Sequence, residues 1–95
     1  MRYKVVFSET AARDLSEIFD YVAAHGSADR AIAYLARLQK SIDSLKQFPN
    51  RGSMRDDLRP GLRAFGFEHR IAVAFEVGES EVTILRVLYG GRELK

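Results

Sequence analysis

The stretch "ILRVLYGGR" (Ile84–Arg92) decides how this chain can fold. Its first five residues are apolar apart from Arg86, so an extended segment here is hydrophobic on both faces. Strands of this kind lie inside a sheet, and we expect this one to be the sheet's central strand. Tyr89, two glycines and Arg92 follow, and they form an active site, a contact surface or only the end of the strand.

Other segments supply further strands for the same sheet. Arg70–Val77 is also apolar on both faces, and Gly78–Ser80 predicts a hairpin turn between it and Glu81–Leu88. Leu62–Phe67 precedes these two as another strand. Arg2–Phe7 alternates apolar and basic residues, which predicts a strand at the start of the chain. We expect that strand to lie beside the last one, because both are apolar enough to be interior.

Two amphipathic helices are predicted between the first strand and the others. Ser8 is a suitable N-cap for the first helix and Gly26 a suitable C-terminal cap. Ser27 caps the second helix, Pro49 stops it, and the short connection makes the pair an antiparallel hairpin. The apolar positions are Ala11, Ala12, Leu15, Ile18, Phe19 and Val22 in the first helix, with Asp14 among the polar residues outside that face, and Ala31, Leu35, Leu38, Ile42 and Leu45 in the second.

These elements predict an α+β fold with the order strand, helix, helix, strand, strand, strand. We expect a single domain over residues 1–95, with an antiparallel sheet of about four strands and the helical hairpin packed on one face. Asn50–Gly61 is the longest connection and has no periodicity, so it is predicted to be a loop.

Composition narrows the class of protein. The chain has 95 residues, no cysteine and a formal net charge of +2, so disulfides and thiolate metal sites are excluded. No signal peptide or membrane-spanning segment is recognisable, and we expect a soluble, cytoplasmic protein. The net charge by itself does not indicate nucleic-acid binding. From Arg51 onward, however, arginines become frequent, and they form either a solvated surface balanced by nearby acids or a basic face for an acidic partner.

Several kinds of catalytic site lack the residues they need. His25 and His69 are the two histidines, and their spacing fits no metal site. Ser8 and Ser27 are explained as helix caps, without a histidine partner for nucleophilic catalysis. Gly90-Gly91 follows a strand but precedes no helix, so a phosphate-binding loop is excluded.

Acid–base chemistry on RNA is the remaining catalytic hypothesis. The residues that could converge at one edge of the sheet are Arg63, Glu68, His69, Arg70, Arg86, Tyr89 and Arg92. Each also has a structural interpretation. Glu68 and His69 suit a polar turn. Arg86 within an apolar strand suits an ion pair with an acid such as Glu17 or Asp20, or a side chain that extends to reach solvent. A free tyrosine has a pKa near 10, which makes Tyr89 a poor base without activation.

The sequence resembles the ParE branch of the RelE/ParE toxin superfamily over nearly its whole length. Ser8–Val22, "SETAARDLSEIFDYV", is similar to the family's A-x-x-D-L-x-x-I-x-x-Y helix. Leu45–Gly52, "LKQFPNRG", looks like L-x-x-x-P-x-x-G, and Leu58–Phe65, "LRPGLRAF", resembles L-R-x-G-x-R. Val82–Glu93, "VTILRVLYGGRE", is close to the I-x-R-V-L-H-x-x-R ending. The four motifs occur in the family's order.

The resemblance implies a toxin of a type II toxin–antitoxin module, of the kind linked to plasmid stabilisation. ParE-type toxins poison DNA gyrase, whereas RelE-type toxins cleave mRNA on the ribosome. In both, the C-terminal segment of an antitoxin wraps around the toxin. This chain has Tyr89 where relatives often have histidine, and it carries neither a lysine-rich set nor a clear general base. We therefore expect a gyrase inhibitor rather than an enzyme, with the ribosome-dependent mRNA endonuclease as the alternative.

The resemblance also directs the choice of site residues. Ala12, Leu15, Phe19 and Leu35 are expected to contact a ParD-like antitoxin, because apolar helix grooves accept a partner helix. Target binding is assigned to Tyr89, Arg92 and Arg86, and the catalytic set of the alternative is Arg63, Arg70 and Tyr89. No cofactor, metal, membrane or direct DNA contact is expected.

Overall fold

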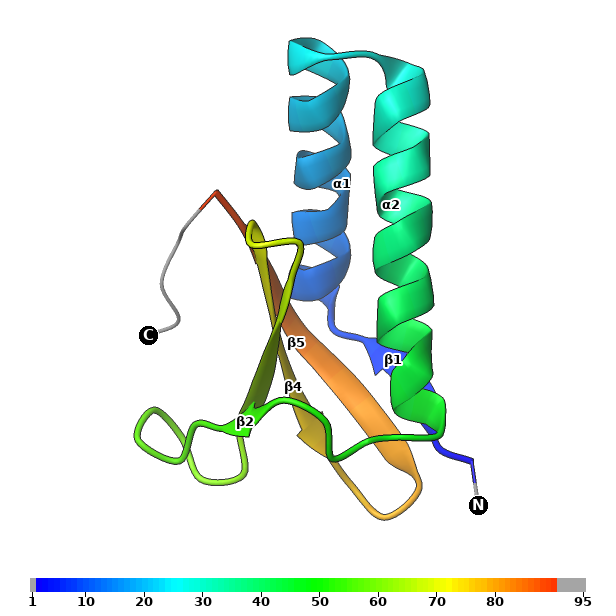
Figure 1. The fold of residues 1–95 in the computed structure, drawn as a ribbon. Coiled ribbons are helices and arrows are strands. Elements are labelled where there is room, and N and C mark those ends of the chain that lie inside the picture. The colour runs from blue at the N-terminus through cyan, green and yellow to red at the C-terminus, as the bar shows by residue number, and fades with distance from the viewer. Residues whose placement is uncertain (1, 91–95) are drawn as a thin grey trace.

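The computed structural model describes residues 2–90, and Figure 1 shows a helical hairpin standing on one face of a sheet. The elements are β1 (Lys4–Phe7), α1 (Glu9–His25), α2 (Ala28–Asp43), the 3-10 turn η1 (Ser44–Lys46), β2 (Ser53–Met54), β3 (Arg63–Phe67), β4 (Ile71–Val77) and β5 (Glu81–Tyr89). Within the described residues, no helix has the length and apolar character needed to cross a membrane.

The sheet has the strand order β1-β5-β4-β3-β2. The predicted placement of the first strand beside the last is confirmed. Two details were wrong. The sheet has five strands rather than about four, since Ser53–Met54 forms a short edge strand inside the predicted loop Asn50–Gly61. It is also mixed rather than antiparallel, because the two helices carry the chain back across the sheet and leave β1 parallel to β5.

Strand β5 is interior, but β4 occupies the centre of the sheet. The register between them shifts near Ala74, which pairs with Arg86, while Phe75 pairs with Ile84. Leu85 is therefore an extra residue on β5, as in a β-bulge. This irregularity lets Val82, Ile84 and Val87 join one core although their spacing breaks the two-residue period of a strand.

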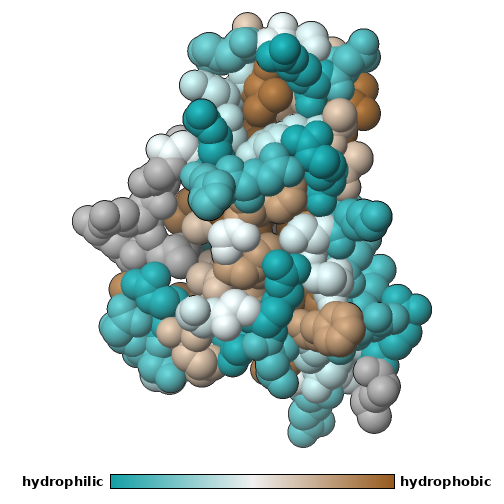
Figure 2. All heavy atoms as spheres, in the orientation of Figure 1, coloured by the Kyte–Doolittle hydropathy of each residue, from teal (hydrophilic) through white to brown (hydrophobic). Residues whose placement is uncertain are grey.

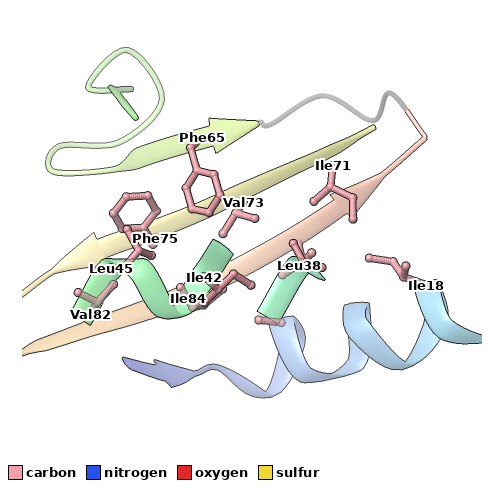
Figure 3. Packing of buried hydrophobic residues seen from close by; sticks show 12 residues of the cluster. Ile18, Leu38, Ile42, Leu45, Phe65, Ile71, Val73, Phe75, Val82 and Ile84 are labelled. Atoms are coloured by element: carbon pink, nitrogen blue, oxygen red, sulfur yellow. The ribbon is translucent and has the colours of Figure 1, made fainter. Parts of the chain in front are cut away.

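Figure 3 shows the core between the sheet and the helical hairpin. Leu38 and Ile42 of α2 and Leu45 of η1 face Val73 and Phe75 of β4, and all five are fully buried. Helix α2 ends at Asp43, and the 3-10 turn then carries the chain toward the predicted stop at Pro49. The packing uses the predicted apolar faces of both helices.

Two side chains of the α1 region fasten it to β5. The Ser8 hydroxyl accepts a hydrogen bond from the Ala11 amide (3.0 Å) and donates one to the carbonyl of Leu85 (3.0 Å). Further along α1, Asp14 accepts hydrogen bonds from the guanidinium of Arg86 (2.9 and 3.2 Å) and from the amide of Val87 (2.9 Å). Backbone groups at the bulge, the carbonyl of Leu85 and the amide of Val87, thus form hydrogen bonds with side chains of the α1 region.

The expectations for Asp14 and Arg86 were both wrong in detail. Asp14 is 6% exposed rather than on the solvent face, and it is Asp14, not Glu17 or Asp20, that pairs with Arg86. The reason is the helical spacing, which puts Asp14 on the same face as the buried Ala11 and Ile18. The hydrogen bonds to Asp14 raise the pKa of Arg86, so its guanidinium stays charged.

The segment before β3 is held by its backbone and by Arg51. Gly52 has a φ of +82°, and a Cβ at this position would lie 2.3 Å from the carbonyl oxygen of Ala64, so only glycine fits. The guanidinium of Arg51 lies 4.1 Å from the ring centroid of Phe65 and donates to the hydroxyl of Ser44 (2.7 Å). Arg51 therefore stabilises this connection from within rather than forming part of a free basic face.

The substitution Asp14→Ala tests the fastening of α1 to β5. We expect it to lower the free energy of unfolding by about 2–4 kcal/mol, because it leaves the buried Val87 amide and the Arg86 guanidinium without their acceptor. Urea denaturation followed by circular dichroism measures the change. Asp57→Ala is the matched control, since Asp57 also takes two hydrogen bonds from an arginine but is exposed. Equal effects of the two substitutions would contradict this role.

Candidate functional site

The candidate site lies between the helical hairpin and the end of the sheet that is formed by the β3–β4 turn and the last residue of β5. Figure 1 shows the α1–α2 connection projecting beyond the β3–β4 turn. A cavity of about 400 Å³ lies between the hairpin and this turn. Its walls are Val22, Arg30, Ala33, Tyr34 and Arg37 from the hairpin, with Glu68, Arg70 and Tyr89 from the end of the sheet.

The rings of Tyr34 and Tyr89 line the site. The ring of Tyr89 lies 5.4 Å from that of Tyr21 and 6.2 Å from that of Tyr34, measured between centroids. Tyr34 also contacts Phe67 at 5.8 Å, and His25 stacks on Tyr21 at 4.1 Å. The tilted and edge-on arrangements are the favourable ones for aromatic pairs. Tyr89 therefore packs its ring against the core.

The hydroxyl of Tyr34 is buried, and no described residue forms a hydrogen bond with it. Burial, with smaller effects from Tyr89 and Glu68, raises the pKa of Tyr34. The group is therefore a neutral O–H donor throughout the physiological pH range. A buried polar group without a partner costs free energy, so this hydroxyl marks the cavity as a place where an acceptor is missing.

Arginine dominates the charge of the cavity. Arg37 donates two hydrogen bonds to Glu68, at 2.9 and 3.1 Å, and its guanidinium lies 5.4 Å from the ring centroid of Tyr34. The hydrogen bond from Arg37 lowers the pKa of Glu68, and the same contact raises the pKa of Arg37. Arg30 and Arg70 form no ion pair with any residue from 2 to 90.

The turn that carries Glu68 has an unusual backbone. Glu68 and His69 have φ values of 48° and 59°, a left-handed conformation that is uncommon outside glycine. The polar turn predicted at these residues is therefore confirmed. The carbonyl of Arg70 accepts a hydrogen bond from the Gly90 amide (3.0 Å), which fixes the turn against the end of β5. Strain of this kind is often found at functional sites.

Tyr89 and Arg70 also line a second hollow on the α1 side. It has a volume of about 420 Å³, and the acidic side chains of Asp14 and Glu17 lie in its wall. Its other walls are Ile18, Tyr21, Val87 and Gly90. Tyr89 thus separates a basic hollow from a more acidic one.

The structure does not bring the three residues of the predicted catalytic set together. Arg70 and Tyr89 lie together, but Arg63 is at the opposite end of β3, paired in register with Phe75. The guanidinium of Arg63 donates to the carbonyl oxygens of Asn50 and Arg51, so it is occupied in holding the connection before β3. Within the described residues, no group of three or more histidines and carboxylates is placed to hold a metal ion.

The residues predicted for protein contacts are distributed over the hairpin and β5. Ala12 is exposed, and Leu15, Phe19 and Leu35 are half-buried. Of the residues predicted for target binding, Tyr89 is half-buried, Arg86 is held by Asp14, and Arg92 lies outside the described residues. Figure 2 shows hydrophobic patches among the polar side chains of one face, over both the hairpin and the sheet.

Sequence reasoning missed part of the site. Tyr21, which lines the second hollow, is 50% exposed and was not predicted as a site residue. Tyr34 and Arg37 were also missed, because each reads as an ordinary position of an amphipathic helix. The one available signal was that a tyrosine falls three residues after the buried Ala31, on the inward side of α2.

Comparisons with known proteins match nearly the whole chain to one protein family. The family described as "ParE toxin of type II toxin-antitoxin system, parDE" matches residues 5–94. "Toxin ParE3" of Caulobacter vibrioides is 33% identical over 91 residues, which cover 96% of this chain and 90% of that relative. "Toxin ParE1" of Mycobacterium tuberculosis is 30% identical over 89 residues, covering 94% and 91%.

Two solved structures share the architecture. A chain of the "Chromosomal ParDE TA system from P. aeruginosa" superimposes with a TM-score of 0.81 at 24% identity, covering 94% of this chain and 97% of that one. A chain of the toxin–antitoxin complex RelBE2 from Mycobacterium tuberculosis gives a TM-score of 0.63 at 21% identity, covering 94% and 99%. At these identities the likeness establishes the fold, an α+β domain with a helical hairpin on a sheet.

Tyr89→Ala tests whether the tyrosine ring organises the site. We expect a loss of about 2 kcal/mol in the free energy of unfolding, because the half-buried ring lies against both Tyr21 and Tyr34. The near-ultraviolet circular dichroism of the tyrosines should also weaken. Tyr89→Phe keeps the ring and serves as the control, so it should retain most of the stability. A large loss with phenylalanine would show instead that the hydroxyl carries the interaction.

Proposed function

Because the chain belongs to the ParE toxin family of type II toxin–antitoxin systems, we propose that it inhibits DNA gyrase by direct binding and is neutralised by a cognate antitoxin. Gyrase is the target expected for the ParE branch, and the named relatives are ParE toxins. An antitoxin partner is supported by the two similar folds, which come from a ParDE system and from a toxin–antitoxin complex.

The observation that favours a binding protein over a ribonuclease is the separation of Arg63 from Arg70 and Tyr89. An acid–base centre needs its proton donor, proton acceptor and phosphate-binding cations within hydrogen-bond reach of one substrate. Here Arg63 holds backbone carbonyls at one end of the sheet, while Arg70 and Tyr89 lie at the other. In addition, Glu68 is held as an ionised partner of Arg37.

We assign target binding to the end of β5, through Tyr89 and Arg92, with Arg86 placing the strand through its bond to Asp14. We assign antitoxin binding to the outer face of α1 and the adjoining side of α2, through Ala12, Leu15, Phe19 and Leu35. Ala12, Leu15 and Phe19 recur at helical spacing, and partly exposed apolar residues in such a row suit a partner helix laid along the hairpin.

A supercoiling assay beside a translation assay tests the target. We expect the purified chain to abolish supercoiling of relaxed plasmid by DNA gyrase and to leave the mRNA of a ribosomal translation reaction uncut. Arg92→Ala should weaken the inhibition about tenfold, as the loss of one charged contact does. Arg59→Ala is the control, since Arg59 is paired with Glu76 away from β5's end. Cut mRNA with intact supercoiling would favour the endonuclease instead.

Charge placed on the outer face of α1 tests the antitoxin site. With the protein encoded by the adjacent gene as the partner, we expect Ala12→Glu to raise the dissociation constant at least tenfold, or roughly 1.4 kcal/mol, because an unpaired carboxylate would enter an apolar interface. Isothermal titration calorimetry measures the affinity. Thr10→Glu adds the same charge at an exposed position of α1 on the other side of the helix from the apolar row and should bind normally. Equal affinities of the two variants would move the antitoxin to another face.

A further inference from the structure

The basic cavity between the hairpin and the β3–β4 turn has a composition that the proposed surfaces leave unexplained. It presents the guanidinium groups of Arg30, Arg37 and Arg70 against one carboxylate, that of Glu68. Glu68 is already taken by Arg37 through two hydrogen bonds. Two cations therefore face this space without an acidic partner among residues 2–90, which favours an anionic ligand.

The aromatic rings do not provide a platform for a nucleobase. Tyr89 lies between Tyr21 and Tyr34, and the guanidinium of Arg37 lies over the ring of Tyr34. Since the rings are engaged with one another and with Arg37, base stacking, the usual mode for single-stranded nucleic acid, has no clear surface here. Recognition must instead come from charge and hydrogen bonds.

The Tyr34 hydroxyl adds a requirement for an acceptor. It is buried, and within the described part of the chain it has no hydrogen-bond partner. As a neutral phenol it donates one hydrogen bond, and a carboxylate oxygen is the strongest common acceptor for such a donor in proteins. An arginine beside it can take the second carboxylate oxygen, so that the anion is held from two sides.

The walls of the cavity indicate that the carboxylate belongs to a peptide. The apolar side chains of Val22 and Ala33 line it together with the arginines. A volume of about 400 Å³ exceeds the needs of an isolated inorganic anion and leaves room for a side chain and its neighbours.

We propose that this cavity receives an aspartate or glutamate side chain from the protein partner that neutralises the chain, bound by Arg70, Arg30 and the hydroxyl of Tyr34. The inference rests on the proposed antitoxin and adds a charged anchor to the apolar contact along α1. Arg37 and Glu68 shape the cavity wall, with Glu68 holding the third guanidinium in place.

A short acidic peptide provides the test. The probe is acetyl-Ala-Leu-Glu-Leu-Ala-amide, titrated into the full chain while the arginine Nε–H and tyrosine ring signals are followed by NMR. We expect saturable shifts at Arg70 and Arg30, with affinity at least about tenfold above that of the matched glutamine peptide. Arg70→Gln and Tyr34→Phe should each weaken binding several-fold. Arg55→Gln, which removes a guanidinium paired with Asp57 elsewhere, should leave it unchanged.

Three outcomes would overturn the inference. They are equal binding of the glutamate and glutamine peptides, unchanged affinity in Arg70→Gln, and phosphate binding as tight as the acidic peptide, which would indicate a site for a free anion. Arg30→Gln, at an exposed helix position, keeps the test decisive if another variant fails to fold. The probe requires neither gyrase nor antitoxin. Failure of the supercoiling or antitoxin assays therefore leaves this result standing, and loss of probe binding leaves those assays unaffected.

Discussion

The buried carboxylate of Asp14 is the interaction on which the rest of the structure depends. It accepts hydrogen bonds from both the side chain of Arg86 and the backbone of Val87, and so joins α1 to β5 at a fixed register. Any sliding of the helix along the strand would leave an unpaired charge in a buried site, which is far more costly than a shifted apolar contact. The upper half of α1, with Tyr21, is thereby held over the end of β5, where Tyr89 completes the site.

Local patterns in the sequence were sufficient for most of the secondary structure. The helices, their serine caps and the strand hairpin follow from periodicity and capping chemistry, which depend on neighbours only a few residues apart. Asp14 shows the limit of such patterns. Its polarity placed it on the solvent side, whereas its helical position and the Arg86 guanidinium place it inside. A partly buried ion pair between residues 72 positions apart cannot be predicted from either residue's neighbours.

The bulge at Leu85 and the strand β2 were missed for a related reason. The apolar run of β5 was taken as a strand with two buried faces, but part of its appearance comes from one extra residue that changes which side chains point inward. Strand β2 has only two residues, and it is specified by the close approach of Gly52 to Ala64 rather than by side-chain character. Backbone geometry of this kind leaves little trace in hydrophobic periodicity.

The two proposed binding surfaces meet at one residue. Tyr89 lines the basic cavity and also ends β5, so it belongs both to the proposed partner pocket and to the proposed target surface. A partner carboxylate bound at Arg70 would place protein over the ring of Tyr89. If both proposals hold, antitoxin and gyrase cannot occupy the end of β5 together, since two chains cannot fill the same volume. Neutralisation then requires no conformational change in the toxin. It is sufficient that the antitoxin covers the end of β5, whose position relative to α1 is fixed by the hydrogen bonds of Asp14.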